Sequence, residues 1–190
     1  MRSILLTLAF FAYTATVLAQ DDVFSNKTNM AIEKVVKDFP NRFHNIKGDV
    51  ITQRAQTTEY KSTIQVPGTS ACIVTKHVSL GNDSYSWNCT AFTSRDFTLA
   101  RSKFKEIFDQ IENTIIKVEG QKPFIISGQY RTPVEERKST EIIFELLPAV
   151  GDMKKLKIEL SLQQASSEWK VAINIYDGDN KEDGSTVINN

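Results

Sequence analysis

The chain has 190 residues, of which 23 are Lys or Arg and 23 are Asp or Glu, and it contains only two Cys and two His. At 41% hydrophobic and 24% charged, it has an ordinary globular composition, which excludes collagen-like, disordered and disulfide-dense classes. With a formal net charge of zero, the chain lacks the basic excess typical of nucleic-acid-binding proteins, so we expect no nucleic-acid partner. The few His and Cys leave little material for metal or nucleophile chemistry, and we expect no cofactor.

Residues 1–19 have the pattern of a cleaved secretory signal peptide. A basic residue precedes an apolar run over 4–15, and small residues occupy the positions that a signal peptidase reads before a cut after Ala19. The apolar run is short for a bilayer span, which disfavours the alternatives of a membrane anchor or a buried N-terminal helix. Cleavage leaves 171 residues with a formal charge of −1 and no further run of spanning length. We therefore expect an exported protein, periplasmic or extracellular, without a membrane span.

An amphipathic helix is predicted at 25–39, where apolar residues recur at three- and four-residue spacing. Pro40 disfavours a helical conformation in the residue before it, so a kink is expected there. Phe43 and Ile46 prolong the same apolar stripe until Gly48 ends it.

Four strands are predicted next, at 49–56, 57–66, 71–80 and 84–92. The first is weak, whereas 57–66 alternates cleanly between the two sides of a strand. Residues 71–80 and 84–92 carry their apolar residues at alternate positions and flank a Gly-Asn-Asp turn, as an antiparallel hairpin does.

The two cysteines, Cys72 and Cys89, lie on the apolar side of this hairpin. An oxidising compartment and neighbouring strands favour a cross-strand disulfide between them. A redox or nucleophilic role is the alternative, but that chemistry favours an accessible thiolate, often in a C-x-x-C pair.

A second amphipathic helix is predicted at 94–118, closed by Gly120. Its apolar stripe indicates core packing rather than a cofactor site. Strands follow at 123–130, 138–147, 155–164 and 168–176, the last two with clear two-residue periodicity.

The predicted fold class is therefore α+β: a single domain over 20–177 with antiparallel β-meanders covered on one face by two amphipathic helices. The halves 26–93 and 96–177 each read as one helix and four strands, which suggests two α-β-β-β-β repeats. The alternative is an ordinary α+β alternation without duplication. Residues 178–190 are polar and aperiodic, and we expect a flexible tail.

Three Asn-x-Ser/Thr patterns occur, at Asn26, Asn82 and Asn88. They are glycosylation acceptors if the source is eukaryotic. If the source is bacterial, they are turn and strand-surface residues.

Other motifs fall short of a catalytic or metal site. Asp177, Asp179 and Asp183 resemble part of a calcium loop, but Lys and Glu stand where that loop needs a ligand and a Gly. His44 and His77 lack the grouped ligands of a zinc site, and no G-x-S-x-G nucleophile motif is present. The chain also lacks the glycine-rich patterns that bind nucleotide phosphates.

By elimination, the sequence favours a non-catalytic binding module with an unknown protein partner. A carrier of a small apolar ligand in a helix–sheet cavity is the alternative. A carboxylate-based hydrolase is a weaker one, for which the sequence offers a group of acidic residues: Glu135, Glu136, Glu141 and Glu145. Candidate contact residues for a partner are those whose apolar side chains are expected on the outer face: Phe92, Ile143, Leu147 and Tyr176. The alternative, which the sequence favours, is that a second layer of the fold covers these residues.

Overall fold

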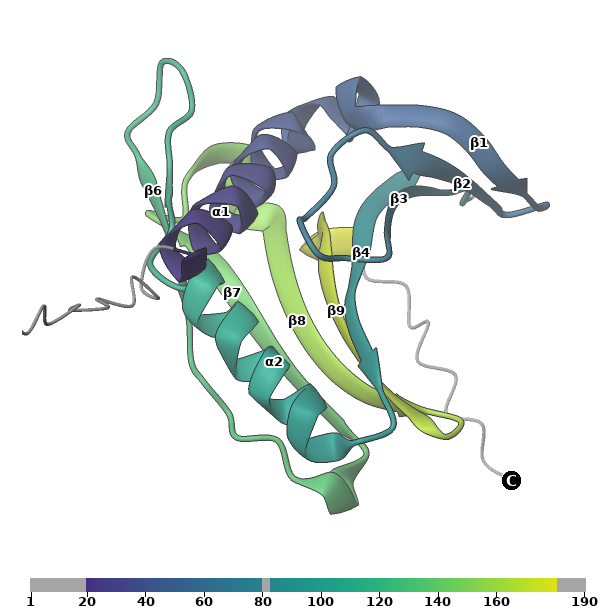
Figure 1. Cartoon of the computed structure of the whole chain (residues 1–190). Coiled ribbons are helices and arrows are strands. Elements are labelled where there is room, and N and C mark those ends of the chain that lie inside the picture. The colour runs from purple at the N-terminus through teal and green to yellow at the C-terminus, as the bar shows by residue number, and fades with distance from the viewer. Residues whose placement is uncertain (1–19, 80–82, 181–190) are drawn as a thin grey trace, which may run out of the picture.

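The computed structural model describes residues 20–79 and 83–180, which form one antiparallel nine-stranded sheet and two α-helices (Figure 1). The helices are α1 (Gln20–Asp38) and α2 (Phe97–Ile111). The strands are β1 (Lys47–Gln53), β2 (Thr57–Ser62), β3 (Ala71–His77), β4 (Ser84–Ser94), β5 (Ile115–Ile116), β6 (Phe124–Gly128), β7 (Ser139–Leu147), β8 (Leu156–Ala165) and β9 (Glu168–Asp177). The α+β class is thereby confirmed. The predicted signal peptide, residues 1–19, lies outside the described residues.

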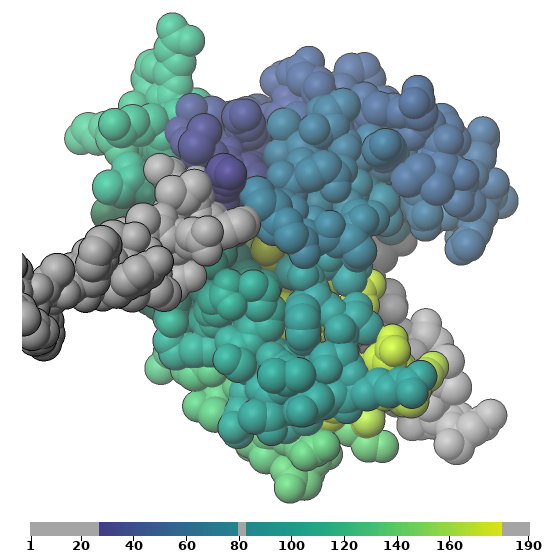
Figure 2. Space-filling view, in the orientation of Figure 1, coloured from purple at the N-terminus to yellow at the C-terminus, as the bar shows by residue number. Residues whose placement is uncertain are grey.

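The strand order across the sheet is β1-β2-β3-β4-β9-β8-β7-β6-β5. Strands of the first half lie on one side and strands of the second half on the other, joined where β4 pairs with β9. In the space-filling view, β1–β3 gather at the upper right and α2 at the lower centre (Figure 2). The β4–β9 junction thus brings together segments that are far apart in the sequence.

Alternation along the strands separates two faces of the sheet. In β4, Trp87, Cys89 and Ala91 are buried, whereas the residues between them are half-buried and point the other way. Strand β7 repeats this pattern, so one face carries the core. In β8 and β9 the core-side residues are buried in the same way, and Glu159, Ser161 and Ala172 are buried on the opposite side as well. We call the opposite face, which points away from the core, the open face.

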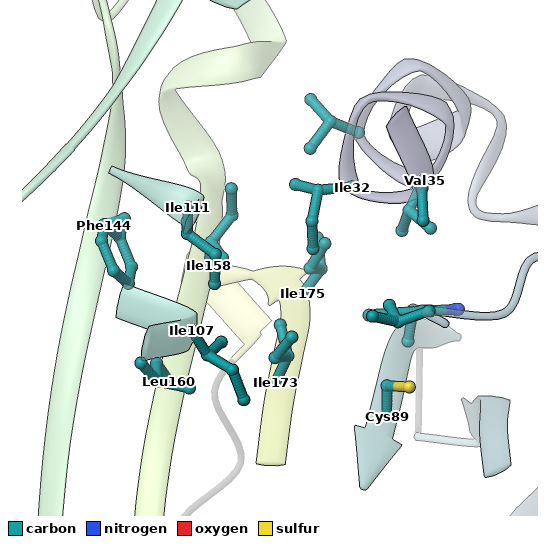
Figure 3. Close-up of a cluster of buried hydrophobic side chains, with 14 of the residues drawn as sticks. Ile32, Val35, Cys89, Ile107, Ile111, Phe144, Ile158, Leu160, Ile173 and Ile175 are labelled. Atoms are coloured by element: carbon teal, nitrogen blue, oxygen red, sulfur yellow. The ribbon is translucent and has the colours of Figure 1, made fainter. Parts of the chain in front are cut away.

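Helix α2 packs against β4, β8 and β9, and α1 packs against α2. Asp96 caps α2, because its carboxylate accepts hydrogen bonds from the backbone N–H groups of Thr98 (2.7 Å) and Leu99 (3.2 Å). Figure 3 shows the resulting core, in which aliphatic side chains of α1 and α2 lie among those of β8 and β9. The helices contribute Ile32, Val35, Ile107 and Ile111, and the strands contribute Ile158, Leu160, Ile173 and Ile175.

The predicted helix 94–118 is wrong at its C-terminal end. The helix stops at Ile111, and Asn113 adopts a left-handed conformation with φ of 63°. Ile115 and Ile116 then form β5, paired with β6. Their β-branched side chains suit an edge strand as well as a helix stripe, and Asn tolerates the left-handed turn. Ile115 is consequently exposed rather than buried.

The first predicted helix also ends where Pro40 requires it. Phe43 and Ile46 are buried as the stripe predicts, but Phe43 precedes and Ile46 ends a short 3-10 turn. The Asp38 carboxylate holds this turn, because it accepts hydrogen bonds from the backbone N–H of Asn45 (3.0 Å) and from that residue's side-chain amide (2.7 Å).

The disulfide prediction is confirmed. Cys72 and Cys89 are bonded and are direct partners in the register of β3 and β4. Both are buried on the core face, at 1% and 0% exposed. Burial and bonding leave neither sulfur available as a nucleophile.

The strand predicted at 57–66 ends at Ser62, whose hydroxyl anchors the following loop. Ser62 accepts a hydrogen bond from the indole Nε1 of Trp87 (3.0 Å) and donates one to the carbonyl of Ile64 (2.8 Å). Both Ser62 and Trp87 are buried. A buried hydroxyl that satisfies an indole N–H fixes both strands at this point.

We expect Ser62→Ala to lower the free energy of unfolding by about 1–3 kcal/mol, because it leaves the buried indole N–H of Trp87 without an acceptor. Urea denaturation measures the change. In a Trp87→Phe background the same substitution should cost clearly less, since no indole N–H remains. An equal cost in both backgrounds would refute the role given to this hydrogen bond.

None of the helices in the described part of the chain has the length and apolarity needed to cross a membrane.

Candidate functional site

Polar side chains cross the open face in rows set by the strand register. One row runs through Thr75, Ser86 and Tyr176 on β3, β4 and β9. The next runs through Asn88, Asn174 and Glu159 on β4, β9 and β8. Both rows cross the β4–β9 junction, so the site is assembled from the two halves of the chain.

These rows line a hollow of about 490 Å³, which we call the open-face hollow. Its walls come from β2, β3, β4, β8 and β9, together with Arg54 after β1. It is lined by Arg54, Thr57, Glu59, Ile73, Thr75, His77, Ser84, Tyr85, Ser86, Asn88, Glu159, Asn174, Tyr176 and Asp177. All of the lining residues except Ile73 carry a polar or charged group, and two of them are tyrosines.

Glu159 is the most buried charged residue of the hollow, at 8% exposed. Its carboxylate accepts hydrogen bonds from the side-chain amide of Asn174 (3.0 Å) and from the Tyr176 hydroxyl (3.1 Å). Asn174 in turn accepts a hydrogen bond from the Asn88 amide. A series of hydrogen bonds therefore runs from Asn88 through Asn174 to Glu159. These bonds satisfy the buried carboxylate with protein donors in place of water.

Burial raises the pKa of Tyr176 well above its ordinary value of 10.0, and the nearby negative charge of Glu159 and its hydrogen bond raise it further. The phenol is therefore neutral in the folded protein at all physiological pH values, and it acts as a hydrogen-bond donor to Glu159. The unfolded chain ionises this phenol near pH 10, so this residue's contribution to stability declines as the pH rises above that value.

We expect Glu159→Gln to lower the pKa of Tyr176 toward its ordinary value, because the substitution removes the neighbouring negative charge. Ultraviolet difference titration, with Tyr176→Phe to assign the signal, measures this. Tyr130 serves as an internal control: its pKa is raised mainly by burial, with no contribution from Glu159, and should not move. An unchanged Tyr176 titration in Glu159→Gln would contradict the coupling.

The structure brings His77 to Ser86, but not into a hydrolase site. His77 Nε2 lies 3.4 Å from Ser86 Oγ, at the long limit of a hydrogen bond. Ser86 sits in a central strand paired with both neighbours, at Thr75 and Tyr176, so the backbone amides there serve the sheet rather than an oxyanion. The contact suits a polar wall of the hollow better than a nucleophile.

The other histidine and the acidic cluster lie elsewhere. His44 is exposed next to Lys47, with Nδ1 3.5 Å from Nζ. Glu141 and Glu145 point outward from β7, where the Lys157 ammonium donates to Glu145 (2.7 Å). Among residues 20–79 and 83–180, no group of three or more His, Cys, Asp or Glu is placed to hold a metal ion.

The three glycosylation patterns fall in different places. Asn26 belongs to α1, and Asn82 lies outside the described residues. Asn88 lines the open-face hollow, and its amide donates to Asn174. A glycan at Asn88 would occupy this hollow.

A second hollow of about 380 Å³ adjoins the first, and we call it the rim hollow. Ser84, Tyr85 and Asp177 line both. The rim hollow is otherwise lined by Phe39, Pro40, Arg42, Phe43, Asp83, Asp152, Lys155 and Asp179. The two hollows therefore share a wall at the ends of β4 and β9.

The start of the predicted tail takes part in this rim. Gly178–Asn180 form a 3-10 turn, and the Asp179 carboxylate pairs with the Lys155 ammonium at 2.9 Å. Asp183, the third aspartate of the calcium-like pattern, lies outside the described residues, as does the rest of 181–190.

The predicted apolar contact residues do not form one patch. Ile143 and Leu147 are exposed on β7, at 44% and 46%. Phe92 packs against the core, and Tyr176 lines the open-face hollow. Of these residues, only Tyr176 belongs to the site.

Sequence reasoning missed Glu159, Asn174 and the role of Asn88 as a hydrogen-bond donor. Each stands on the polar side of a regular strand, where a solvated residue is the ordinary expectation. The sequence carries no signal that separates Glu159 and Asn174 from the other polar residues that alternate along these strands.

Comparison of the chain with protein-family models, with curated proteins and with solved structures finds no match.

Proposed function

We propose that this protein is an exported, non-catalytic binding module whose ligand occupies the open-face hollow. The observation that carries the proposal is the chain of hydrogen bonds from Asn88 through Asn174 to the buried carboxylate of Glu159, at the junction of the two halves. Ligand sites use a small number of precisely placed polar groups in a hollow to orient the ligand.

Burying this polar network costs free energy of folding. Burying a carboxylate on the outer side of a sheet is unfavourable unless its hydrogen bonds are satisfied, and an apolar residue would fill the same place at lower cost. A preformed network of this kind lowers the cost of ligand binding, because its side chains are already ordered.

Two features support export. The first is the signal-like pattern of residues 1–19, and the second is the disulfide between Cys72 and Cys89, which suits an oxidising compartment.

The alternative, a carrier of a small apolar ligand, would place that ligand between the helices and the sheet. Large side chains pack this region: Phe104 and Ile111 of α2 and Trp87 of β4 are all fully buried. Native packing of this density favours the open face over the helix–sheet layer as the binding surface.

We further propose that α1 and α2 cover the same face of the sheet and that the two halves arose by duplication. The contacts between α1 and α2 support the shared face. The strand order supports duplication. Read inward from its two edges, the sheet has β1-β2-β3-β4 on one side and, inside the short β5, β6-β7-β8-β9 on the other, and the two series meet at the β4–β9 pair. On this account the ligand site lies where the two repeats join.

The proposal is tested by a nuclear magnetic resonance screen of small polar compounds, small apolar compounds and short peptides. We expect ligands that shift the resonances of β4, β8 and β9, and Asn174→Ala should weaken their binding by about tenfold. Gln163→Ala is the matched control, since Gln163 is an exposed amide on β8 that bonds to Glu141 (3.1 Å) outside the hollow. Apolar ligands that shift only core resonances would overturn the proposal in favour of a carrier.

A further inference from the structure

The open-face hollow is acidic although the chain as a whole is electrically balanced. Three carboxylates line it, from Glu59, Glu159 and Asp177, against the single guanidinium of Arg54. The adjoining rim hollow carries a similar imbalance, with Asp83, Asp152, Asp177 and Asp179 against Arg42 and Lys155. The chain has 23 acidic and 23 basic residues, so the excess of carboxylates in these two hollows is a local feature.

Ion pairs within the fold account for part of this charge, mainly at the rim. Asp83 pairs with the ammonium of Lys76 at 2.7 Å, and Asp179 pairs with that of Lys155 at 2.9 Å. The carboxylates that line the open-face hollow, those of Glu59, Glu159 and Asp177, belong to neither of these two pairs.

Burial makes the charge of Glu159 valuable to a cationic ligand. At 8% exposed, its carboxylate has exchanged most of its water for the two hydrogen bonds from Asn174 and Tyr176. Both of these donors are neutral groups that stabilise the carboxylate. A cation that enters the hollow meets a charge already stripped of most of its water, where attraction is stronger than at an exposed surface.

The aromatic lining is suited to the same ligand. Tyr85 and Tyr176 both line the hollow, and Tyr176 presents a neutral phenol whose hydroxyl is turned toward Glu159. Tyrosine rings attract ammonium and guanidinium groups. The hollow thus combines carboxylates, amide oxygens and aromatic rings.

We infer that the ligand of the open-face hollow is an organic cation with N–H donors, an ammonium or a guanidinium group. This inference rests on the proposed function. The same hollow also holds the carboxylates of Glu59 and Asp177, which can receive a second cationic group of the same ligand. A free polyamine and a polypeptide with two basic side chains both offer this chemistry.

Isothermal titration calorimetry with defined probes tests the inference. The probes are spermidine and an acetylated, amidated peptide with two arginines, compared with peptides of the same length that carry glutamine or glutamate instead. We expect a cationic probe to bind, with an affinity that falls as salt is raised. Whether spermidine or the arginine peptide binds more tightly distinguishes a small-molecule from a polypeptide source.

Glu159→Gln should weaken the binding of the cationic probe by at least about tenfold, since it removes the buried charge and keeps the side-chain shape. Glu145→Gln is the matched control: Glu145 is an exposed carboxylate of the open face that pairs with Lys157 outside the hollow, and its loss should leave affinity within about twofold. Circular dichroism establishes that both variants are folded, and Tyr176→Phe offers a second, conservative change in the same network.

The outcomes separate the inference from the proposed function. Tight binding of the glutamine or glutamate peptide that Asn174→Ala abolishes, with no binding of cations, would overturn the inference and leave the binding module standing. Equal weakening of cation binding by Glu145→Gln and Glu159→Gln would also overturn the inference, because it would show a general attraction of cations to the protein surface. If the magnetic resonance screen yields no ligand at the hollow, both the proposed function and this inference are refuted.

Discussion

Replacing Gly128 with alanine is expected to lower the free energy of unfolding by about 1–3 kcal/mol. Gly128 of β6 lies opposite Phe144 of β7, and a Cβ added to it would stand 2.5 Å from Cδ1 of that ring. The ring is fully buried and packs against Phe108, with 5.3 Å between ring centroids. Alanine therefore displaces either the ring or the strand, and denaturant unfolding measures the loss.

The sign of this effect is diagnostic, because a glycine-to-alanine change in a strand without a close neighbour usually stabilises a protein. Phe144→Leu should relieve the clash, so the double variant should lose less than the sum of the two single losses. Ser127→Ala, one residue earlier in the same strand, should have little effect. A stabilising Gly128→Ala would contradict the packing described here.

Loss of the disulfide is expected to lower the free energy of unfolding by about 3 kcal/mol, as the chain-entropy relation gives for a loop of this size. The two cysteines are 17 positions apart and join neighbouring strands next to the β4–β9 junction. The Cys72→Ala/Cys89→Ala variant and the reduced protein should therefore both unfold at lower denaturant concentration than the oxidised protein.

Reductant provides the control for this prediction. Reductant should leave the free energy of unfolding of the double alanine variant unchanged. It should lower that of the oxidised protein by most of the about 3 kcal/mol assigned to the disulfide. Alanine also removes buried sulfur atoms, so the variant should be somewhat less stable than the reduced protein. An oxidised protein whose unfolding does not respond to full reduction would contradict a structural role for this bond.

Where the sequence had a strong period, it predicted the fold well. Strands expected at 155–164 and 168–176 appear at Leu156–Ala165 and Glu168–Asp177, because alternation over ten residues has one structural explanation. The cysteine pairing followed from the same alternation together with a recognisable turn. Strand β5 was missed since two isoleucines have no period of their own and fit the preceding helical stripe.

The candidate site was beyond prediction for a different reason. The Asn88 and Asn174 amides that meet in the network are separated by 86 positions in the sequence, and Glu159 comes from a third strand. Each residue by itself looks like a solvent-facing side chain. Only the pairing of β4 with β9, a long-range contact that local patterns do not encode, places them together.

The most direct test of the open-face hollow as a binding site is to follow the side-chain amide resonances of Asn88 and Asn174 while the cationic probe is titrated. We predict that both amides shift in a saturable manner, together with backbone amides of β4, β8 and β9, and that Glu159→Gln suppresses these shifts. Saturable shifts confined to α1, α2 and the core, with both asparagine amides unmoved, would contradict the account.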